Sequence, residues 1–156
     1  MSAARLKNFI WPLASFTVLA AMMAVQHSLV PGKIEVTVRL AAIALGLAGA
    51  PTLLVLAFRD WFTNHRANLS SWRNGLGLSS IVVLFAVWML YWAMFVMLWI
   101  WPHFSQSLGG LEWLGLILYS SLLGFVLALT LRGAARPQAI SAAILMWACI
   151  QASIYI

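Results

Sequence analysis

The sequence predicts an all-α integral membrane protein, a single domain over residues 1–156 that forms a bundle of five transmembrane helices. Apolar runs long enough to span a bilayer recur along the chain and carry almost no charge. The composition is 64% hydrophobic and 8% charged, whereas about a quarter of the residues in a water-soluble domain are charged. Most of the Lys and Arg residues lie at the ends of the apolar runs, where lipid headgroups meet them.

The expected spans follow from helix geometry. About 20 residues, at a rise of about 1.5 Å each, cross the ~30 Å hydrocarbon core of a bilayer. The runs that meet this length are residues 9–29, 36–58, 78–101, 111–131 and 138–156. Four transmembrane helices result if the last run, which is rich in alanine, does not span.

The first run follows Arg5 and Lys7 and resembles the start of a signal peptide. Its end, AMMAVQH, offers no pair of small residues at cleavage spacing. We therefore expect an uncleaved span.

The second run contains Arg39 one turn from its start, where the side chain is expected to reach back to the headgroups. Ala42, Gly46 and Ala50 recur at a spacing of four, which allows another helix backbone to approach closely. Pro51 lies inside the run and is expected to kink the helix, because proline removes a backbone hydrogen bond.

The polar connection at residues 59–77 mixes arginines with aromatic residues and is expected to lie along the membrane surface. Arg59, Asp60, His65 and Arg66 resemble a cluster that attracts phosphate, and a hydrated interfacial loop explains them equally well.

The third run, LSSIVVLFAVWMLYWAMFVMLWIW, is the most apolar segment of the chain. Aromatic residues recur in it at steps of three and four, so a helix places them on one face. This stripe consists of Phe85, Trp88, Trp92, Phe95 and Trp99.

The fourth run carries a second set of small residues at a spacing of four, namely Ser120, Gly124 and Ala128. The fifth run holds no charge, and its single cysteine, Cys149, is expected to be a small packing residue. The first or the fifth span is expected to face lipid, while the small faces of the second and fourth bury against partner helices.

Basic residues distinguish the two sides of the expected bundle. Alternate connections place seven Lys and Arg on one side and two, Lys33 and Arg39, on the other. By the positive-inside rule, the N-terminus and the second and fourth connections face the cytoplasm, and the C-terminus faces outward. The expected location is the cell (inner) membrane.

Two histidines and two glutamates fall near the outer ends of the expected spans. His27, His103 and Glu112, with Glu35 nearby, could bind a metal if packing brought them together. No two of them have a spacing typical of ligands, such as H-x-x-x-H, so interfacial side chains that face water are the alternative.

The chain carries no signature of catalysis, and we expect no enzyme. No nucleophile with a base, metal-ligand pair or glycine-rich phosphate loop occurs. The first hypothesis is an accessory or structural subunit that acts through helix packing in a membrane assembly. Its partners would be the lipid bilayer and other membrane subunits or further copies of itself. Nucleic acid is not expected because the basic residues form no continuous face.

Two other functions stay open. The aromatic stripe could stack on a hydrophobic planar ligand of the porphyrin, quinone or sterol type, and Trp88, Trp92, Phe95 and Trp99 are its candidate residues. The chain could also be an oligomeric small-solute or ion transporter, although no carboxylate is expected at bilayer depth for ion coupling. No cofactor is identified.

Overall fold

The computed structural model describes residues 3–27, 32–65, 71–100 and 108–153, and these residues are almost entirely helical. The helices are α1 (Ala3–His27), α2 (Gly32–Ala44), η1 (Leu45–Gly49), α3 (Ala50–His65), α4 (Trp72–Ile100), α5 (Leu108–Ala128) and α6 (Ala135–Ser153). Because α2, the π-helix η1 and α3 follow one another without a break, the described residues form five helical rods. The all-helical prediction is confirmed.

Two of the rods are long and apolar enough to cross a membrane. They comprise Ile34–Asn64, which includes η1, and Trp72–Met94 in α4. Shorter apolar helical segments lie at Ile10–Val25 and Gly115–Ala128. Insertion of all five rods into a bilayer stays a prediction.

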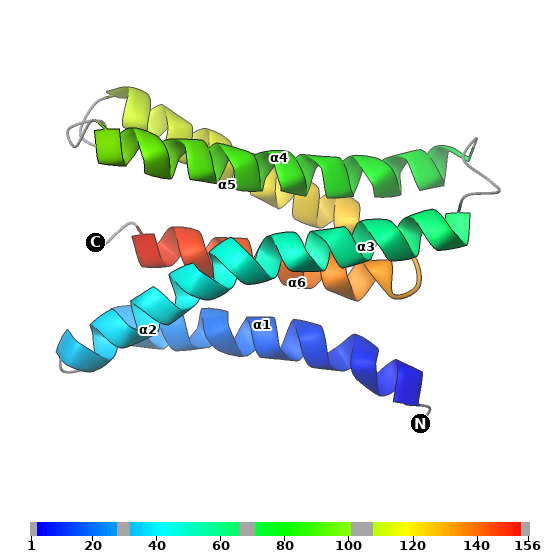
Figure 1. The fold of residues 1–156 in the computed structure, drawn as a ribbon, viewed down its shortest axis with the longest axis horizontal. Coiled ribbons are helices and arrows are strands. Elements are labelled where there is room, and N and C mark those ends of the chain that lie inside the picture. Colours follow the sequence, from blue (N-terminus) through cyan, green and yellow to red (C-terminus); the bar gives the residue numbers. More distant parts are fainter. Residues whose placement is uncertain (1–2, 28–31, 66–70, 101–107, 154–156) are drawn as a thin grey trace.

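Successive rods run in opposite directions (Figure 1). The start of α1, the end of α3, the start of α4 and the turn between α5 and α6 lie together at one end of the bundle. Gly133 makes that turn with φ +65°, a conformation that side chains with a Cβ rarely adopt. This end, called here the basic end, contains Arg59, Arg73, Arg132 and Arg136.

Helix α6 is the centre of the bundle and packs against α1, α2, η1, α3, α4 and α5. Its alanines allow many neighbours to approach, and most of its residues are buried. Of the two helices expected to be candidates for lipid contact, the first is therefore the more exposed one and the fifth the more buried one. Helix α1 exposes Ile10, Leu13 and Phe16, whereas most residues of α6 are buried.

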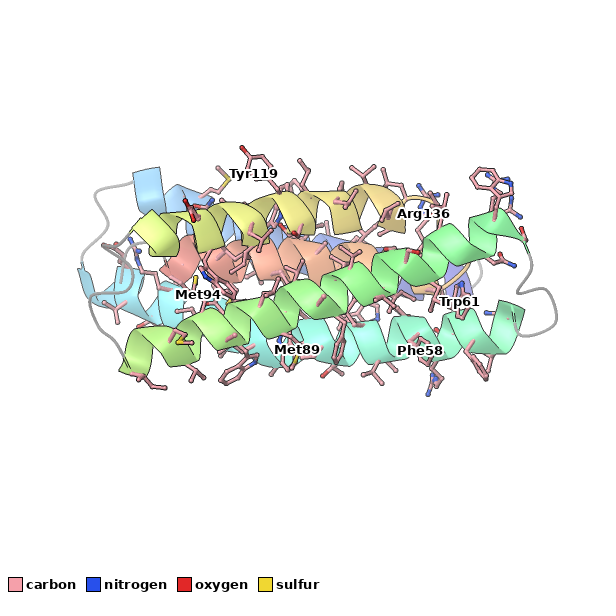
Figure 2. All side chains as sticks on the ribbon, turned by 90° about the horizontal axis from the view of Figure 1, so that it is seen from above. Phe58, Trp61, Met89, Met94, Tyr119 and Arg136 are labelled. Carbon is pink, nitrogen blue, oxygen red and sulfur yellow. The ribbon has the colours of Figure 1, made fainter. Side chains whose placement is uncertain are left out.

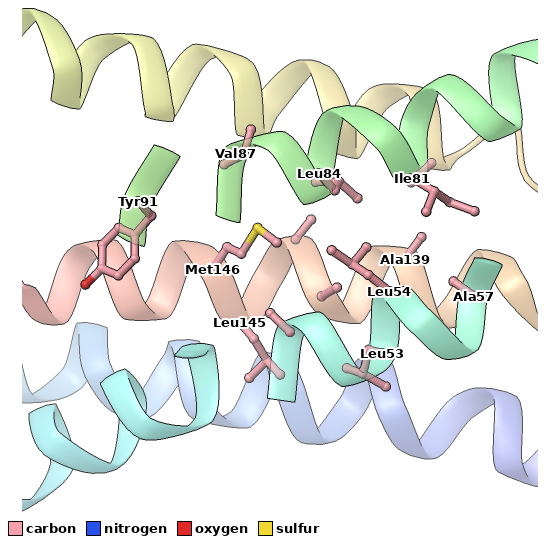
Figure 3. Packing of buried hydrophobic residues seen from close by; sticks show 14 of the residues in the cluster. Leu53, Leu54, Ala57, Ile81, Leu84, Val87, Tyr91, Ala139, Leu145 and Met146 are labelled. Atoms are coloured by element: carbon pink, nitrogen blue, oxygen red, sulfur yellow. The ribbon is translucent and has the colours of Figure 1, made fainter. Parts of the chain in front are cut away.

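The main core lies between α3, α4 and α6 (Figure 3). Leu54, Leu84 and Met146 interlock there and are almost completely buried. Buried serines donate hydrogen bonds to backbone carbonyls, as Ser141 Oγ does to the Pro137 oxygen at 2.6 Å. Such internal pairing is needed where no water is present.

Large apolar side chains also cover the outside of the bundle on α1 to α5 (Figure 2). Exposed examples are Leu13, Leu40, Val55, Met89 and Leu123. Water-soluble monomers rarely expose apolar surface on this scale, so the perimeter is suited to a hydrocarbon environment.

Candidate functional site

The kink expected at Pro51 lies beside the π-helix η1, and α2 runs at an angle to α3 (Figure 1). Proline has no backbone N–H, so the Leu47 carbonyl four residues earlier loses its normal helical donor. The Trp88 indole Nε1 on α4 donates to that Leu47 oxygen at 3.3 Å. The irregular backbone is thus tied to α4 by a side chain from the aromatic stripe.

The small residues of the second rod lie against α6. Ala42, Gly46 and Ala50 are all buried. A Cβ on Gly46 would lie 2.3 Å from the Cys149 Cβ and 3.1 Å from the Leu145 oxygen. The neighbour of this close-contact face is therefore a helix of the same chain, not a helix of another subunit.

The small residues of α5 face α4. Gly124 and Ala128 are buried, and a Cβ on Gly124 would lie 2.6 Å from the Leu84 Cδ2. Ser80 Oγ donates to the Gly124 carbonyl at 3.2 Å. Ser120 is only half-buried. This second small face is also used within the chain.

Ser121, which the sequence pattern did not single out, is the fully buried serine of α5. Its hydroxyl accepts a hydrogen bond from Trp147 Nε1 at 2.7 Å and donates to the Leu118 carbonyl at 2.7 Å. The signal for this pair is weak in the sequence. A tryptophan in an alanine-rich helix needs an acceptor, but the pattern does not say which one.

A polar pair joins α4 and α6 toward the end of the bundle that is opposite the basic end. The Tyr91 hydroxyl and the Ser153 hydroxyl are hydrogen-bonded. Cys149 Sγ lies 3.7 Å from the Ile43 oxygen, so the thiol also faces the irregular part of the second rod.

A void of about 10 Å³ lies beside these groups, lined by Gly46, Val87, Trp88, Tyr91, Met146, Cys149 and Ile150. This volume is near the minimum for one water molecule. This void is therefore too small for a cofactor of the size of a porphyrin, quinone or sterol.

The described rings of the aromatic stripe do not form one flat surface. Trp88 is half-buried, and Trp92 is 37% exposed. The interplanar angle is 47° between Phe85 and Trp88, and 75° between Trp88 and Trp92. These are tilted and edge-to-face contacts between neighbouring rings. The side chains of Phe95 and Trp99 lie outside the described residues.

An apolar groove of about 410 Å³ lies between α3 and α4. It is lined by Leu54, Val55, Phe58, Ile81, Val82, Phe85 and Ala86. The sequence did not reveal it, because a groove depends on how two helices are placed side by side. Phe85 is the member of the aromatic stripe that lines it.

At the basic end, Asp60 connects α3 to α6. Its Oδ2 accepts a hydrogen bond from Gln138 Nε2 at 2.9 Å, and its Oδ1 lies 3.6 Å from Arg59 Nη2. Arg73 and Arg132 line a separate small void beside Trp61. Of the phosphate-attracting cluster expected here, Arg66 and the His65 side chain lie outside the described residues.

The position of the Arg39 side chain differs from the one expected from the sequence. The side chain was expected to reach the headgroups, but the residue is only 8% exposed. It is one turn before Ala42 and shares the face that packs inside the bundle. Its Nη2 donates to Glu35 Oε1, forming an i,i+4 ion pair. Pairing with Glu35 reduces the cost of burying the guanidinium.

Most of the expected metal site lies outside the described side chains, so it stays a prediction. Glu112 is exposed on α5, His27 belongs to α1 with its side chain outside the described part, and His103 is outside it altogether. Over the residues that the structure describes, no group of three His, Cys, Asp or Glu side chains could hold a metal ion.

Comparison with family models, curated proteins and solved structures found no match for this chain.

Proposed function

We propose that this chain is a five-span integral membrane protein that has no catalytic site of its own and acts by packing, as a subunit of a membrane assembly. The basic end faces the cytoplasm, and the C-terminus faces outward. Two observations support the membrane part of the proposal. Apolar side chains cover the perimeter of α1 to α5, and the charged residues lie toward the two ends of the bundle.

An incomplete ring of helices around α6 carries the assembly part of the proposal. Helices α1, α2 with α3, α4 and α5 surround α6 in that order, each packed on the next. Along the described residues, no extensive packing joins α1 to α5. Ile140 and Trp147 are half-buried and seven residues apart, so they share one face of α6, which we assign to this open side. A transmembrane helix from outside the chain would complete the ring there.

The use of both small-residue faces within the chain leaves this open side as the best candidate for a partner. Trp147 lies on the face of α6 at this open side. Its ring is held by the hydrogen bond to Ser121 and by stacking on Phe125, with ring centroids 6.2 Å apart. A rigid aromatic surface loses little conformational freedom when it is covered, which favours association.

Site-specific photo-crosslinking in native membranes tests this function. A benzoylphenylalanine at Ile140 should form an adduct with a polypeptide, whose mass tells a second copy from a different subunit. The same probe at Leu40, exposed on α2, is the matched control and should form adducts with lipid. Lipid adducts alone at both positions would remove the assembly role.

A further inference from the structure

The groove between α3 and α4 continues toward a positive charge at the basic end. Val55, Phe58 and Arg59 are spaced by three and four along α3, so they share one face of the helix. The first two line the groove, and the Arg59 side chain is 70% exposed. The apolar groove and the accessible guanidinium of Arg59 therefore follow one another along the same surface.

The basic end lacks the carboxylates that its cations would need. The whole chain contains three acidic residues against nine Lys and Arg, with a formal net charge of +6. Glu35 pairs with Arg39, and Glu112 belongs to the opposite end of the bundle. Asp60 is the only acidic side chain at the basic end. It accepts a hydrogen bond from Gln138, and its Oδ1 lies 3.6 Å from Arg59 Nη2, so it offsets one positive charge there. One carboxylate against several arginines leaves an excess of positive charge at this end, which attracts anions from outside the protein.

From this combination we propose a binding site for an anionic phospholipid, with one acyl chain in the α3–α4 groove and the phosphate on Arg59. The proposal goes beyond the packing function and does not depend on it. The groove is lined entirely by apolar residues, and its volume of about 410 Å³ is within the range of ligand sites. Arginine donates two hydrogen bonds in a geometry that matches a phosphate.

A lipid is favoured over a free phosphate because it alone occupies both parts of the site. A soluble phosphate would gain the charge of Arg59 but leave the groove empty. An uncharged apolar molecule would fill the groove but gain nothing from the positive charge of the basic end.

Native mass spectrometry of the full-length protein in detergent tests the site. The probes are phosphatidylglycerol and phosphatidylcholine with identical acyl chains. The parent protein should hold one phosphatidylglycerol in preference to phosphatidylcholine. Arg59→Gln should reduce that preference about tenfold, the loss expected for one hydrogen-bonded charge pair. Val82→Trp should fill the groove and lower the occupancy of both lipids.

Two matched variants separate the site from general surface effects. Arg136 is at the same end but on the opposite side of the bundle from Phe58 (Figure 2), so Arg136→Gln should leave the preference within twofold. Leu123→Trp introduces the same side chain at an exposed position of α5 and should leave occupancy unchanged. Thermal unfolding of each variant establishes that it is folded.

Three results would overturn the proposal. Equal losses in Arg59→Gln and Arg136→Gln would show diffuse charge attraction. Equal binding of the two lipids by the parent protein would show that the headgroup is not recognised. Displacement of bound lipid by glycerol 3-phosphate would show that a free phosphate is the ligand.

Discussion

The indole N–H of Trp88 donates to the carbonyl of Leu47, which is the oxygen that Pro51 leaves without its normal helical donor. A proline kink in one rod is thus stabilised by an aromatic residue on another. This relationship explains why an irregular helix is tolerated in the middle of an apolar bundle, where an unpaired carbonyl is costly.

Replacing Trp88 by Phe should destabilise the fold by about 1 to 3 kcal/mol, because the Leu47 oxygen is left without this partner in an apolar interior. The measurement is thermal or denaturant unfolding in detergent. Trp92→Phe is the control, since Trp92 is more exposed and should change stability less.

A double-mutant cycle with Pro51→Ala isolates the mechanism. Alanine restores a backbone N–H that can reach the Leu47 carbonyl. Trp88→Phe should therefore lower the free energy of unfolding by less in the Pro51→Ala background. Equal costs in both backgrounds would mean that the hydrogen bond does not compensate for the proline.

Three glycines should differ in their response to alanine. Gly46→Ala should be the most destabilising, because the new Cβ would meet the Cys149 Cβ at 2.3 Å and a backbone oxygen. Gly124→Ala should be milder, since its closest contact is the end of the Leu84 side chain, which can move. Gly75→Ala meets nothing within 4 Å and should be neutral or stabilising by up to about 1 kcal/mol. The same stability for all three variants would refute the close-contact faces.

Adjacent serines on α5 provide a matched pair. Ser121→Ala should cost about 1 to 3 kcal/mol, because Trp147 Nε1 loses its acceptor inside the bundle. Ser120→Ala should have little effect, since Ser120 is half-buried. Tryptophan fluorescence of Trp147, in a variant that retains only this tryptophan and is shown to fold, would report the change directly. A larger loss of stability for Ser120→Ala than for Ser121→Ala would contradict the assignment of Ser121 as the acceptor of Trp147.

The helices themselves could be predicted from the sequence, but their placement could not. Each apolar run corresponds to one rod, and Pro51 correctly predicted an irregular second helix. The central position of α6 was missed because hydropathy does not distinguish lipid from protein neighbours. Lipid tails are as apolar as leucine, so a helix that faces lipid and a helix enclosed by protein have similar hydropathy.

The contacts that define the interior were missed for a related reason. Burial of Arg39 depends on how α2 is rotated against α6, and the Trp88 bond to Leu47 depends on the relative height of two helices. A spacing of four identified Gly46 and Gly124 as close-contact residues, but it gave no indication that their neighbours belong to the same chain.

Reporter fusions that distinguish cytoplasm from exterior test the five-span membrane arrangement most directly. Fusions after residues 69 and 133 should report the cytoplasm, and fusions after residues 109 and 156 should report the outside. A fusion after residue 156 that reports the cytoplasm would contradict the account, because α6 would then not cross the membrane as the fifth span or the whole bundle would be inverted.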